Sequence, residues 1–134
     1  MKEIGFIIDL PKFLDERGNL SVVEEGRNIP FSIERTYWIY DVPGGERRGG
    51  HAYRENQEII IALSGSFDII LNDGITTKTY HLCRSYYGLY IPKMIWREIV
   101  NFSTNSVALI HASTKYDMND YIREYDSFIE LKKK

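Results

Sequence analysis

The chain carries side chains whose types and spacing suit acid–base chemistry, chief among them His51, Glu58 and Arg97. A neutral imidazole can take or give a proton near pH 7, so His51 can act as base and acid in one turnover. Arg97 has a permanent positive charge and no lone pair, so it repels a divalent cation and attracts an anion or a developing oxyanion. Glu58 either accepts hydrogen bonds from an arginine or tyrosine or orients the His51 ring. These residues predict organic acid–base chemistry.

Some of the arginines and histidines are candidate site residues, and the others are interpreted as structural or surface residues. Arg97 lies in the middle of an expected strand, where an unpaired guanidinium would be costly, so it needs a carboxylate, phosphate or ketone within reach. Arg48 precedes a glycine pair and could clamp a phosphate, whereas Arg47 is interpreted as an exposed loop charge. His81 and His111 are interpreted as structural or surface residues. With 10 tyrosines in the chain, an aromatic-lined, arginine-bearing pocket would suit a nucleotide-linked sugar.

Short strands must position these side chains, because the apolar residues mostly recur with a period of two. The runs are rich in β-branched and aromatic residues and are separated by turn residues such as Asn72, Asp73 and Gly74, which predict a hairpin. With no helix between the strands, the pattern favours an antiparallel sandwich or jelly roll. The expected strands are 33–40, 58–63, 66–71, 76–82, 88–92, 96–101 and 106–111.

The two ends of the chain follow other patterns. Over 117–134 apolar residues recur at intervals of three and four, with Asp117 or Asn119 available as a cap and lysines in the last turn. This predicts a short amphipathic helix on the outside of the barrel or on a partner subunit. At the other end, residues 15–18 are expected to form a turn between an N-terminal strand and a strand over 19–24.

Composition limits the possible classes of protein. At 134 residues, with 43% hydrophobic and 27% charged residues, we expect one domain over 1–134. A formal net charge of −2 without a basic block argues against a nucleic-acid partner. No stretch approaches the roughly 20 apolar residues of a membrane span, and the start does not resemble a signal peptide, so we expect a cytoplasmic protein without a membrane partner. The single cysteine, Cys83, is expected to be a small buried residue.

The spacing of the candidate residues resembles the metal-binding motifs of cupins. Those motifs contain a histidine, a second ligand two residues later, a glutamate, a glycine seven residues after it, and a histidine five residues after a later proline. The matching residues are His51, Glu58, Gly65 and Pro92. Tyr53 and Arg97, however, stand at the other two ligand positions. The resemblance implies an all-β cupin jelly roll with a short C-terminal helix, and the two replacements predict that no metal and no cofactor is bound.

The chain as a whole resembles the sugar 3,4-ketoisomerases that act on dTDP-4-keto-6-deoxyglucose, a small cupin family. The resemblance implies a homodimer of jelly rolls, often with an exchanged N-terminal strand, that binds a dTDP-linked keto sugar without metal. The product would be a dTDP-3-keto-6-deoxyhexose for 3-amino-3,6-dideoxy sugar and glycan biosynthesis. The matching stretches are 15–20 (DERGNL), 28–37 (NIPFSIERTY), 48–52 (RGGHA), 63–66 (LSGS), 88–91 (GLYI), 96–98 (WRE) and 120–126 (DYIREYD).

The resemblance also implies a reaction and roles for single residues. A proton leaves C3 of the 4-keto sugar, an enediol forms, and C4 is protonated; this needs a base and a positive group beside the enediolate. His51 would be the base, and Tyr37 and Arg97 would stabilise or protonate the oxygens. Arg17 and Arg48 would help to seat the sugar and the diphosphate. Tyr53 and Glu58 complete the expected substrate-binding residues.

Two departures from the family leave alternatives open. The family usually carries His-x-His, so the role of the second histidine either passes to the Tyr53 hydroxyl or is not essential; at Glu58 a glutamine is common. An arginine at position 97 resembles members with a gluco product, and one at position 17 those with a galacto product; this chain has both, and we favour gluco. The rival functions are a 3,5-epimerase, a non-catalytic sugar-nucleotide-binding cupin and, least favoured, a metal-dependent oxygenase.

Overall fold

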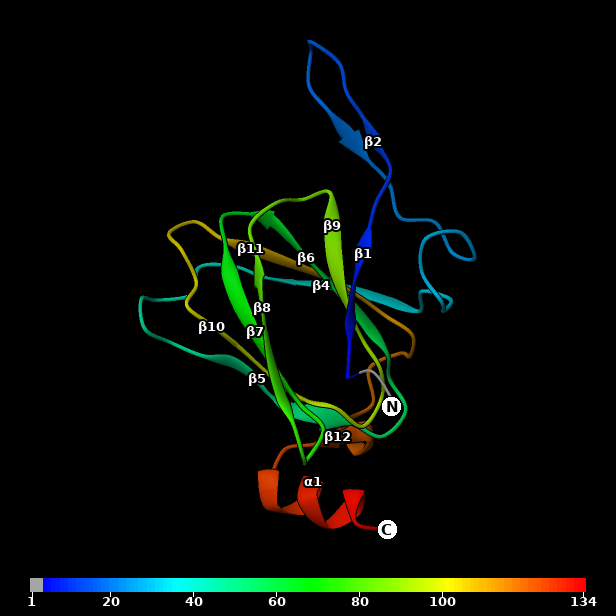
Figure 1. Ribbon diagram of the computed structural model, residues 1–134, viewed down its shortest axis with the longest axis vertical. Coiled ribbons are helices and arrows are strands. Elements are labelled where there is room, and N and C mark those ends of the chain that lie inside the picture. Colours follow the sequence, from blue (N-terminus) through cyan, green and yellow to red (C-terminus); the bar gives the residue numbers. More distant parts are fainter. Residues whose placement is uncertain (1–3) are drawn as a thin grey trace.

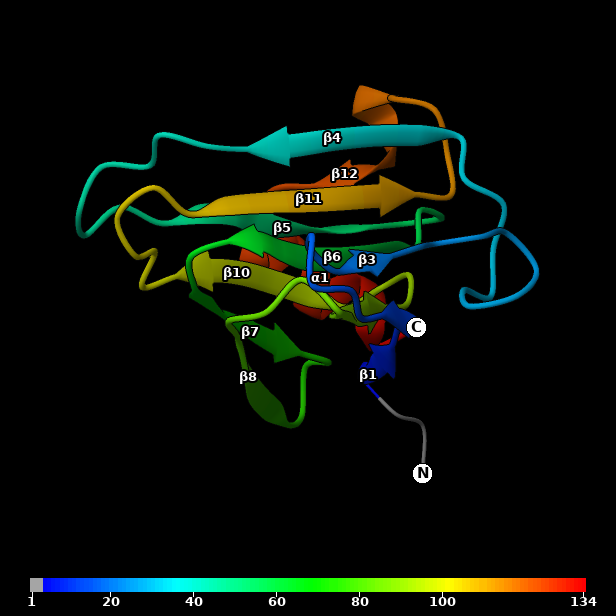
Figure 2. The same cartoon turned by 90° about the horizontal axis from the view of Figure 1, so that it is seen from above.

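Two antiparallel sheets packed face to face form the body of the protein. The computed structural model describes residues 4–134. One sheet has the strand order β1-β9-β6-β11-β4 and the other β12-β5-β10-β7-β8, and their strands cross the molecule in two layers (Figures 1 and 2). The strands are β1 (Phe6–Asp9), β2 (Lys12–Phe13), β3 (Leu20–Ser21), β4 (Arg35–Ile39), β5 (Arg48–Tyr53), β6 (Glu58–Ser64), β7 (Phe67–Asn72), β8 (Thr77–Leu82), β9 (Tyr87–Ile91), β10 (Trp96–Val100), β11 (Val107–Ala112) and β12 (Tyr121–Ile122). The antiparallel all-β architecture predicted from the sequence is confirmed.

The space between the two sheets has an apolar half and a polar half. Side chains of one parity point inward, so one half is filled by apolar residues that are fully buried. The fully buried side chains of this half include Ile60, Phe67, Ile69, Leu71, Leu82, Leu89, Ile99 and Ile110. The same alternation brings polar and ionisable side chains of β4, β5, β6 and β10 into the other half. The apolar half therefore supplies the core, and the polar half is free to carry chemistry.

The predicted hairpin between β7 and β8 is present. Asn72 pairs with Thr77 across the two strands. Within the turn, the Asp73 carboxylate accepts hydrogen bonds from the backbone N–H groups of Ile75 and Thr76 at 2.8 and 2.7 Å. Gly74 has φ +97°, a conformation that suits glycine. The local turn chemistry thus explains why the sequence signal was reliable here.

The C-terminal segment differs from the predicted continuous helix. Asp117 caps a short 3₁₀ helix, Met118–Asp120, by accepting the N–H of Asn119. The next residues form β12, which pairs with Ala52 and Tyr53 of β5. The α-helix α1 covers only Tyr125–Lys132. The prediction was wrong over 117–124 because strand pairing to β5 satisfies the backbone there, which periodicity alone does not reveal.

Helix α1 packs on its own barrel. Phe128 is fully buried and forms a cluster with Ala52, Trp96 and Ile122. Figure 1 shows the helix closing one end of the molecule beneath β12. Of the two placements expected from the sequence, the barrel is therefore the one observed, and the apolar face of α1 is already covered.

The N-terminal segment covers part of the outer face of one sheet and then leaves the barrel. Leu10, Ile29 and Phe31 pack against Ile59 and Ile61 of β6 on the face opposite the interior. Between them, β2 and β3 form a hairpin that projects away from the two sheets (Figure 1). We call residues 12–21 the arm.

The arm contains the predicted turn, but its second strand is shorter than expected. The N–H of Gly18 donates to the carbonyl oxygen of Asp15 at 3.0 Å, which closes the turn at 15–18. Strand β3 covers Leu20–Ser21, not 19–24. Phe13 and Leu14 are 57% and 73% exposed, so the arm presents apolar side chains that nothing within the described chain covers.

Two further observations concern composition-based expectations. Cys83 is exposed, so its expected burial was wrong; it follows the last residue of β8 and lies in the loop before β9. The helices among residues 4–134 are too short to cross a lipid bilayer.

Candidate active site

Five ionisable side chains from four strands meet in the polar half of the interior. Tyr37 comes from β4, His51 and Tyr53 from β5, Glu58 from β6 and Arg97 from β10. Arg97 lies directly opposite His51 in the β5–β10 ladder, so both side chains point to the same face. Glu58 and Arg97 are each 1% exposed, while His51 is 9% exposed. These are five of the seven site residues expected from the sequence, and the structure brings them together.

A β-bulge in β5 positions this ladder. Arg97 pairs with His51 whereas Ile99 pairs with Arg48, so β5 has one extra residue between the two pairs. Gly49 lies in this bulge with φ +72°. A Cβ atom on Gly49 would lie 3.2 Å from Nη1 of Arg97. The glycine pair before His51 therefore provides the backbone geometry of the bulge and the space for the guanidinium.

A buried ion pair joins the two sheets. Nη2 of Arg97 lies 2.9 Å from Oε1 of Glu58, and the Tyr37 hydroxyl donates a short hydrogen bond to Oε2. Burial lowers the pKa of Arg97, but the negative charge of Glu58 together with the interactions with Tyr37 and Tyr53 raises it, so the pKa lies above its ordinary value. Glu58 thus accepts contacts from an arginine and a tyrosine, one of the two roles expected for it; no hydrogen bond to His51 is present among the described residues.

Nη2 of Arg97 also faces three other acceptors. It lies 3.0 Å from Nε2 of His51, 3.1 Å from the Tyr37 hydroxyl and 3.4 Å from the Tyr53 hydroxyl. Because a guanidinium can only donate, Nε2 of His51 is the acceptor and the ring proton sits on Nδ1. The ring nitrogen that can accept a proton is therefore the one that faces Arg97.

His51 is held neutral by its surroundings. Its pKa is lowered to about 2, chiefly by burial and then by the positive charges of Arg97, Arg123, Arg35 and Arg48, in that order. At neutral pH the imidazole is unprotonated, which is the state that a general base requires.

The two tyrosines are held protonated. Burial raises the pKa of Tyr37, and the charge of Glu58 raises it further. The same two causes raise the pKa of Tyr53. Both hydroxyls can therefore donate a proton or a hydrogen bond to an oxygen that becomes negative beside Arg97.

Several buried polar atoms of this cluster have no hydrogen-bond partner. They are Nε and Nη1 of Arg97 and Oε1 of Glu58, whose contact with Arg97 is an ion pair without hydrogen-bond geometry. Unsatisfied buried polar atoms are uncommon and mark sites that a polar ligand can complete. Among residues 4–134 no three or more His, Cys, Asp or Glu side chains are grouped as metal ligands.

An aromatic and cationic rim that the sequence analysis missed adjoins His51. The ring centroid of Tyr121 lies 5.0 Å from that of His51 and 4.7 Å from that of Tyr53. The Arg123 guanidinium lies 4.2 Å from the Tyr121 centroid. Residues 120–126 match the ketoisomerase family in sequence, but the helical spacing predicts a helix there, and so it does not reveal that β12 places Tyr121 against the site.

Two expected site residues lie outside the cluster. Arg17 is on the arm, where its side chain is 90% exposed and forms an ion pair with Asp15 at 2.8 Å. Arg48 is exposed at the start of β5, near enough for its charge to act on His51. Arg47, expected to be an exposed loop charge, is 63% exposed and pairs with Glu98 at 2.9 Å.

His81 and His111 lie where structural or surface residues are expected. His81 lies on the surface, 62% exposed, with Nδ1 2.7 Å from Asp68. His111 is half-buried and contacts the Thr36 hydroxyl at 3.0 Å. Neither belongs to the cluster around Arg97.

Comparisons with known proteins agree with the geometry. The chain matches the FdtA family, described as WxcM-like, C-terminal, over residues 4–133. It is 42% identical over 122 residues to the TDP-4-oxo-6-deoxy-α-D-glucose-3,4-oxoisomerase of Aneurinibacillus thermoaerophilus, covering 91% of this chain and 88% of the relative.

Solved structures give the same result. The 3,4-ketoisomerase of Helicobacter canadensis superposes with a TM-score of 0.94 at 40% identity, covering 97% of this chain and 98% of that one. QdtA of Thermoanaerobacterium thermosaccharolyticum, a sugar 3,4-ketoisomerase in complex with TDP, has a TM-score of 0.95 at 35% identity, covering 99% and 97%. The RmlC epimerase of Mycobacterium tuberculosis, at 15% identity over 88% of this chain and 67% of that one, shares the fold alone, with a TM-score of 0.75. The chain therefore belongs to the FdtA family of nucleotide-sugar 3,4-ketoisomerases and has the cupin jelly-roll fold.

Proposed function

We propose that the protein converts dTDP-4-keto-6-deoxyglucose to a dTDP-3-keto-6-deoxyhexose by acid–base tautomerisation. The observation that carries this proposal is a neutral His51 whose Nε2 lies 3.0 Å from Arg97, with the hydroxyl of Tyr37 3.1 Å from the same nitrogen of Arg97. A base, a cation and a proton donor then converge on one point, as enolisation beside a ketone requires. The names of the relatives support the same reaction.

The proposed steps balance as four proton transfers, two that involve His51 and two that involve Tyr37. His51 takes the proton from C3, and the electrons of the C3–H bond form a C3–C4 double bond while the C4 carbonyl oxygen becomes negative beside Arg97. Tyr37 donates to that oxygen and regains a proton from the 3-hydroxyl as the C3 carbonyl forms. Once this proton has exchanged with water, His51 returns a proton to C4. The low basicity of buried His51 favours this return, because an imidazolium beside Arg97 is unstable.

Tyr53 and Glu58 support the reacting groups. We place the Tyr53 hydroxyl, 3.4 Å from Nη2 of Arg97, on a sugar oxygen, where it replaces the second histidine of the family. Glu58 acts through its neighbours, because its two oxygens contact Arg97 and Tyr37. Neither residue needs a metal or a cofactor for this role.

We favour the gluco product. The sequence left the C4 configuration open because arginines stand at both positions 17 and 97. Arg97 belongs to the buried cluster of its own chain, whereas Arg17, on the projecting arm, reaches a site only where the arm crosses to a partner, so we give Arg97 the greater weight. The 3-keto product suits a following amination at C3, as expected for 3-amino-3,6-dideoxy sugar biosynthesis. The cytoplasmic location expected from the sequence stays a prediction.

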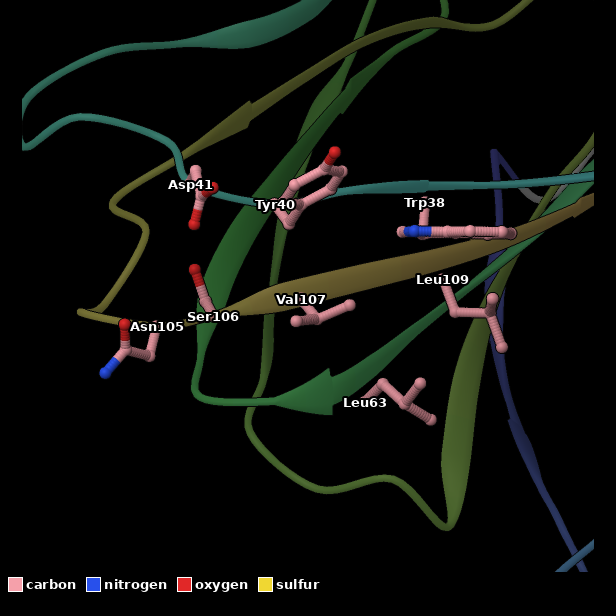
Figure 3. Close-up of a pocket in the computed structure, with 8 residues that line it drawn as sticks. All are labelled: Trp38, Tyr40, Asp41, Leu63, Asn105, Ser106, Val107 and Leu109. Carbon is pink, nitrogen blue, oxygen red and sulfur yellow. The ribbon is translucent and has the colours of Figure 1, made fainter.

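We propose that the working unit is a homodimer. The outer face of the β4–β11–β6 sheet carries a groove of about 520 Å³ (Figure 3), with Trp38 57% and Leu63 51% exposed. The arm of the same chain carries the apolar side chains of Phe13 and Leu14, and no other part of the described chain covers them. A second copy would cover both kinds of surface, and an arm that crosses to its partner would carry Arg17 to the partner's site. A monomeric mass in sedimentation at micromolar protein would contradict this assembly.

The experiment that tests the reaction is incubation with dTDP-4-keto-6-deoxyglucose in deuterated water, with the deuterium located by NMR. We expect a 3-keto product with deuterium at C4. Exchange at C3 and C5 with a retained 4-ketone would favour the rival 3,5-epimerase. Binding without any exchange would favour the non-catalytic sugar-nucleotide-binding protein.

Variants assign the base. His51→Asn keeps a hydrogen bond but cannot shuttle a proton, so we expect the rate to fall by about 10²–10⁴-fold with little change in TDP affinity. Arg97→His leaves the base in place, and we expect a modest loss of rate; the configuration at C4 of its product, determined by NMR, shows whether Arg97 sets the stereochemistry. Near-normal turnover of His51→Asn would refute the mechanism and move the base to Tyr37 or Tyr53.

A further inference from the structure

The turn between β5 and β6, residues 54–57, joins two strands that supply site residues. It crosses from one sheet to the other, with Tyr53 at the end of β5 and Glu58 at the start of β6. The path of this turn therefore sets how Tyr53 and Glu58 lie relative to each other. Whatever fixes the turn also fixes part of the cluster around Arg97.

Three consecutive backbone N–H groups of this turn donate to a single residue, Asp120. The N–H of Arg54 donates to the carbonyl oxygen of Asp120 at 2.9 Å. The N–H groups of Glu55 and Asn56 donate to its two carboxylate oxygens at 2.7 and 3.1 Å. Successive N–H groups form a concave site for an anion, and hydrogen bonds to a carboxylate are stronger than those between neutral groups. The Asp120 carboxylate therefore holds the turn in this conformation.

Asp120 also precedes β12, whose place beside the site depends on anchors outside its own ladder. This strand has two residues and lies at the edge of its sheet, so the ladder to β5 holds it weakly. At its C-terminal end, Ile122 is buried in the apolar cluster that contains Phe128. At its N-terminal end Asp120 is the anchor. The next residue, Tyr121, has its ring centroid 5.0 Å from that of His51.

We propose that Asp120 is a positioning residue: its carboxylate fixes the 54–57 turn and thereby holds the Tyr121 ring against His51. The inference rests on the proposed function, because it assigns a role in placing the groups of that same site. Asp120 acts through the turn and not on the substrate, since both of its carboxylate oxygens accept backbone N–H groups. A displacement of about 1 Å caused by a change away from the chemistry is enough to cost about 100-fold in rate.

The first measurement separates kcat from KM for formation of the 3-keto product. Asp120→Ala removes both acceptor oxygens, whereas Asp120→Asn keeps one. We expect kcat to fall by about 10- to 100-fold in Asp120→Ala and by less in Asp120→Asn, with KM within about threefold of the wild type. Asp73→Ala is the matched control and should keep the wild-type kcat. Its carboxylate also accepts two N–H groups of a turn, those of Ile75 and Thr76, but the β7–β8 hairpin supplies no residue to the cluster.

The second measurement reads the position of Tyr121 by NMR and needs no turnover. Because the two ring centroids are 5.0 Å apart, ring protons of Tyr121 and His51 should show a nuclear Overhauser effect in the wild type. This effect should weaken or vanish in Asp120→Ala and persist in Asp73→Ala. The signals of His81, which lies on β8, should stay unchanged in every variant and report that the barrel is folded.

The outcomes separate the positioning role from the reaction. Either a wild-type kcat or an unchanged Tyr121–His51 contact in Asp120→Ala would overturn the inference, and so would an equal loss of kcat in Asp73→Ala. If Asp120→Ala does not fold, Asp120→Asn decides by the same two measurements. A wild type that incorporates no deuterium from deuterated water would refute the reaction alone. In that case, loss of the Tyr121–His51 contact in Asp120→Ala would still support the placement of Tyr121 by Asp120, and its persistence would overturn it.

Discussion

Acid should destabilise the protein through His51, and the size of the effect follows from the buried imidazole. The pKa of His51 is lowered from 6.5 to about 2 by burial and by the charge of Arg97. In the unfolded chain the ring regains its ordinary pKa. Below about pH 6.5 the unfolded state therefore binds a proton that the folded state does not bind, and unfolding becomes more favourable as the pH falls. Above about pH 6.5 His51 does not reduce the free energy of unfolding; below that pH the reduction grows progressively towards pH 2.

The magnitude can be worked out from the two pKa values. With about 1.36 kcal/mol per pKa unit, His51 lowers the free energy of unfolding by about 0.7 kcal/mol between pH 7 and pH 6 and by about 2 kcal/mol between pH 7 and pH 5. Any folded-state value below about 4 gives nearly the same loss at pH 5, because the proton is then still absent from the folded protein. The prediction depends on the ring being kept neutral, not on how low its pKa lies.

The assay is urea unfolding at pH 7, 6 and 5, at one protein concentration, for the wild type and His51→Asn. Carboxylates such as Asp68, whose pKa is lowered by hydrogen bonds from Asn101 and His81, contribute to acid sensitivity in both proteins, so the difference between the two isolates His51. We expect His51→Asn to lose about 2 kcal/mol less than the wild type from pH 7 to pH 5. Ile69→Val, a core variant that retains His51, should keep the wild-type dependence. Equal pH dependence in wild type and His51→Asn would show that the imidazole is protonated easily and would refute the electrostatic account of the site.

Three further predictions test the surroundings of the site. Glu58→Ala should lower the free energy of unfolding by about 3–5 kcal/mol, because it leaves the Arg97 charge buried without a partner; Glu130→Ala, which breaks an exposed pair, should have little effect, and equal losses would contradict the account. Gly49→Ala should cost about 1–2 kcal/mol in urea unfolding, since its φ is +72° and its Cβ would crowd Arg97, whereas Gly44→Ala, with open space around it, should be nearly neutral. Ketoisomerase activity should survive long incubation with EDTA, because a guanidinium stands at a cupin ligand position; a loss of activity that a divalent metal restores would overturn this.

The sequence predicted the elements whose signals are local. The period of two located β4 and the strands from β6 to β11, and the turn residues at 72–74 located the β7–β8 hairpin, because alternation and turn geometry depend on adjacent residues. It also indicated that Arg97 needs a partner inside the barrel. The spacing of His51, Tyr53 and Glu58 placed them on inward-facing positions of neighbouring strands, and these side chains do meet.

Features that depend on distant contacts were not predictable in the same way. Tyr121 and Ile122 have helical spacing, yet they pair with β5, a partner about 70 residues earlier in the chain. Arg17 lies away from the cluster of its own chain because the arm projects from the barrel. The path of the N-terminal segment over the outer face of the sheet sets this position, and that path depends on contacts with β6. No local pattern predicted that the Tyr121 ring would lie beside His51, because this contact depends on the same distant strand pairing.

The polar half of the barrel interior implies a trade between activity and robustness. Arg97 is among the largest fully buried side chains of the protein, and it fills volume that apolar groups could otherwise occupy. Exchange of a buried ion pair for well-packed apolar residues of similar volume is often neutral or stabilising. Replacing Arg97 and Glu58 together by methionine and leucine would therefore be expected to give a protein that resists unfolding better and no longer turns over its substrate. The stability that this enzyme could gain lies in the cluster that we propose as its catalytic centre, so selection for thermal tolerance must act on the apolar half, the arm and α1 instead.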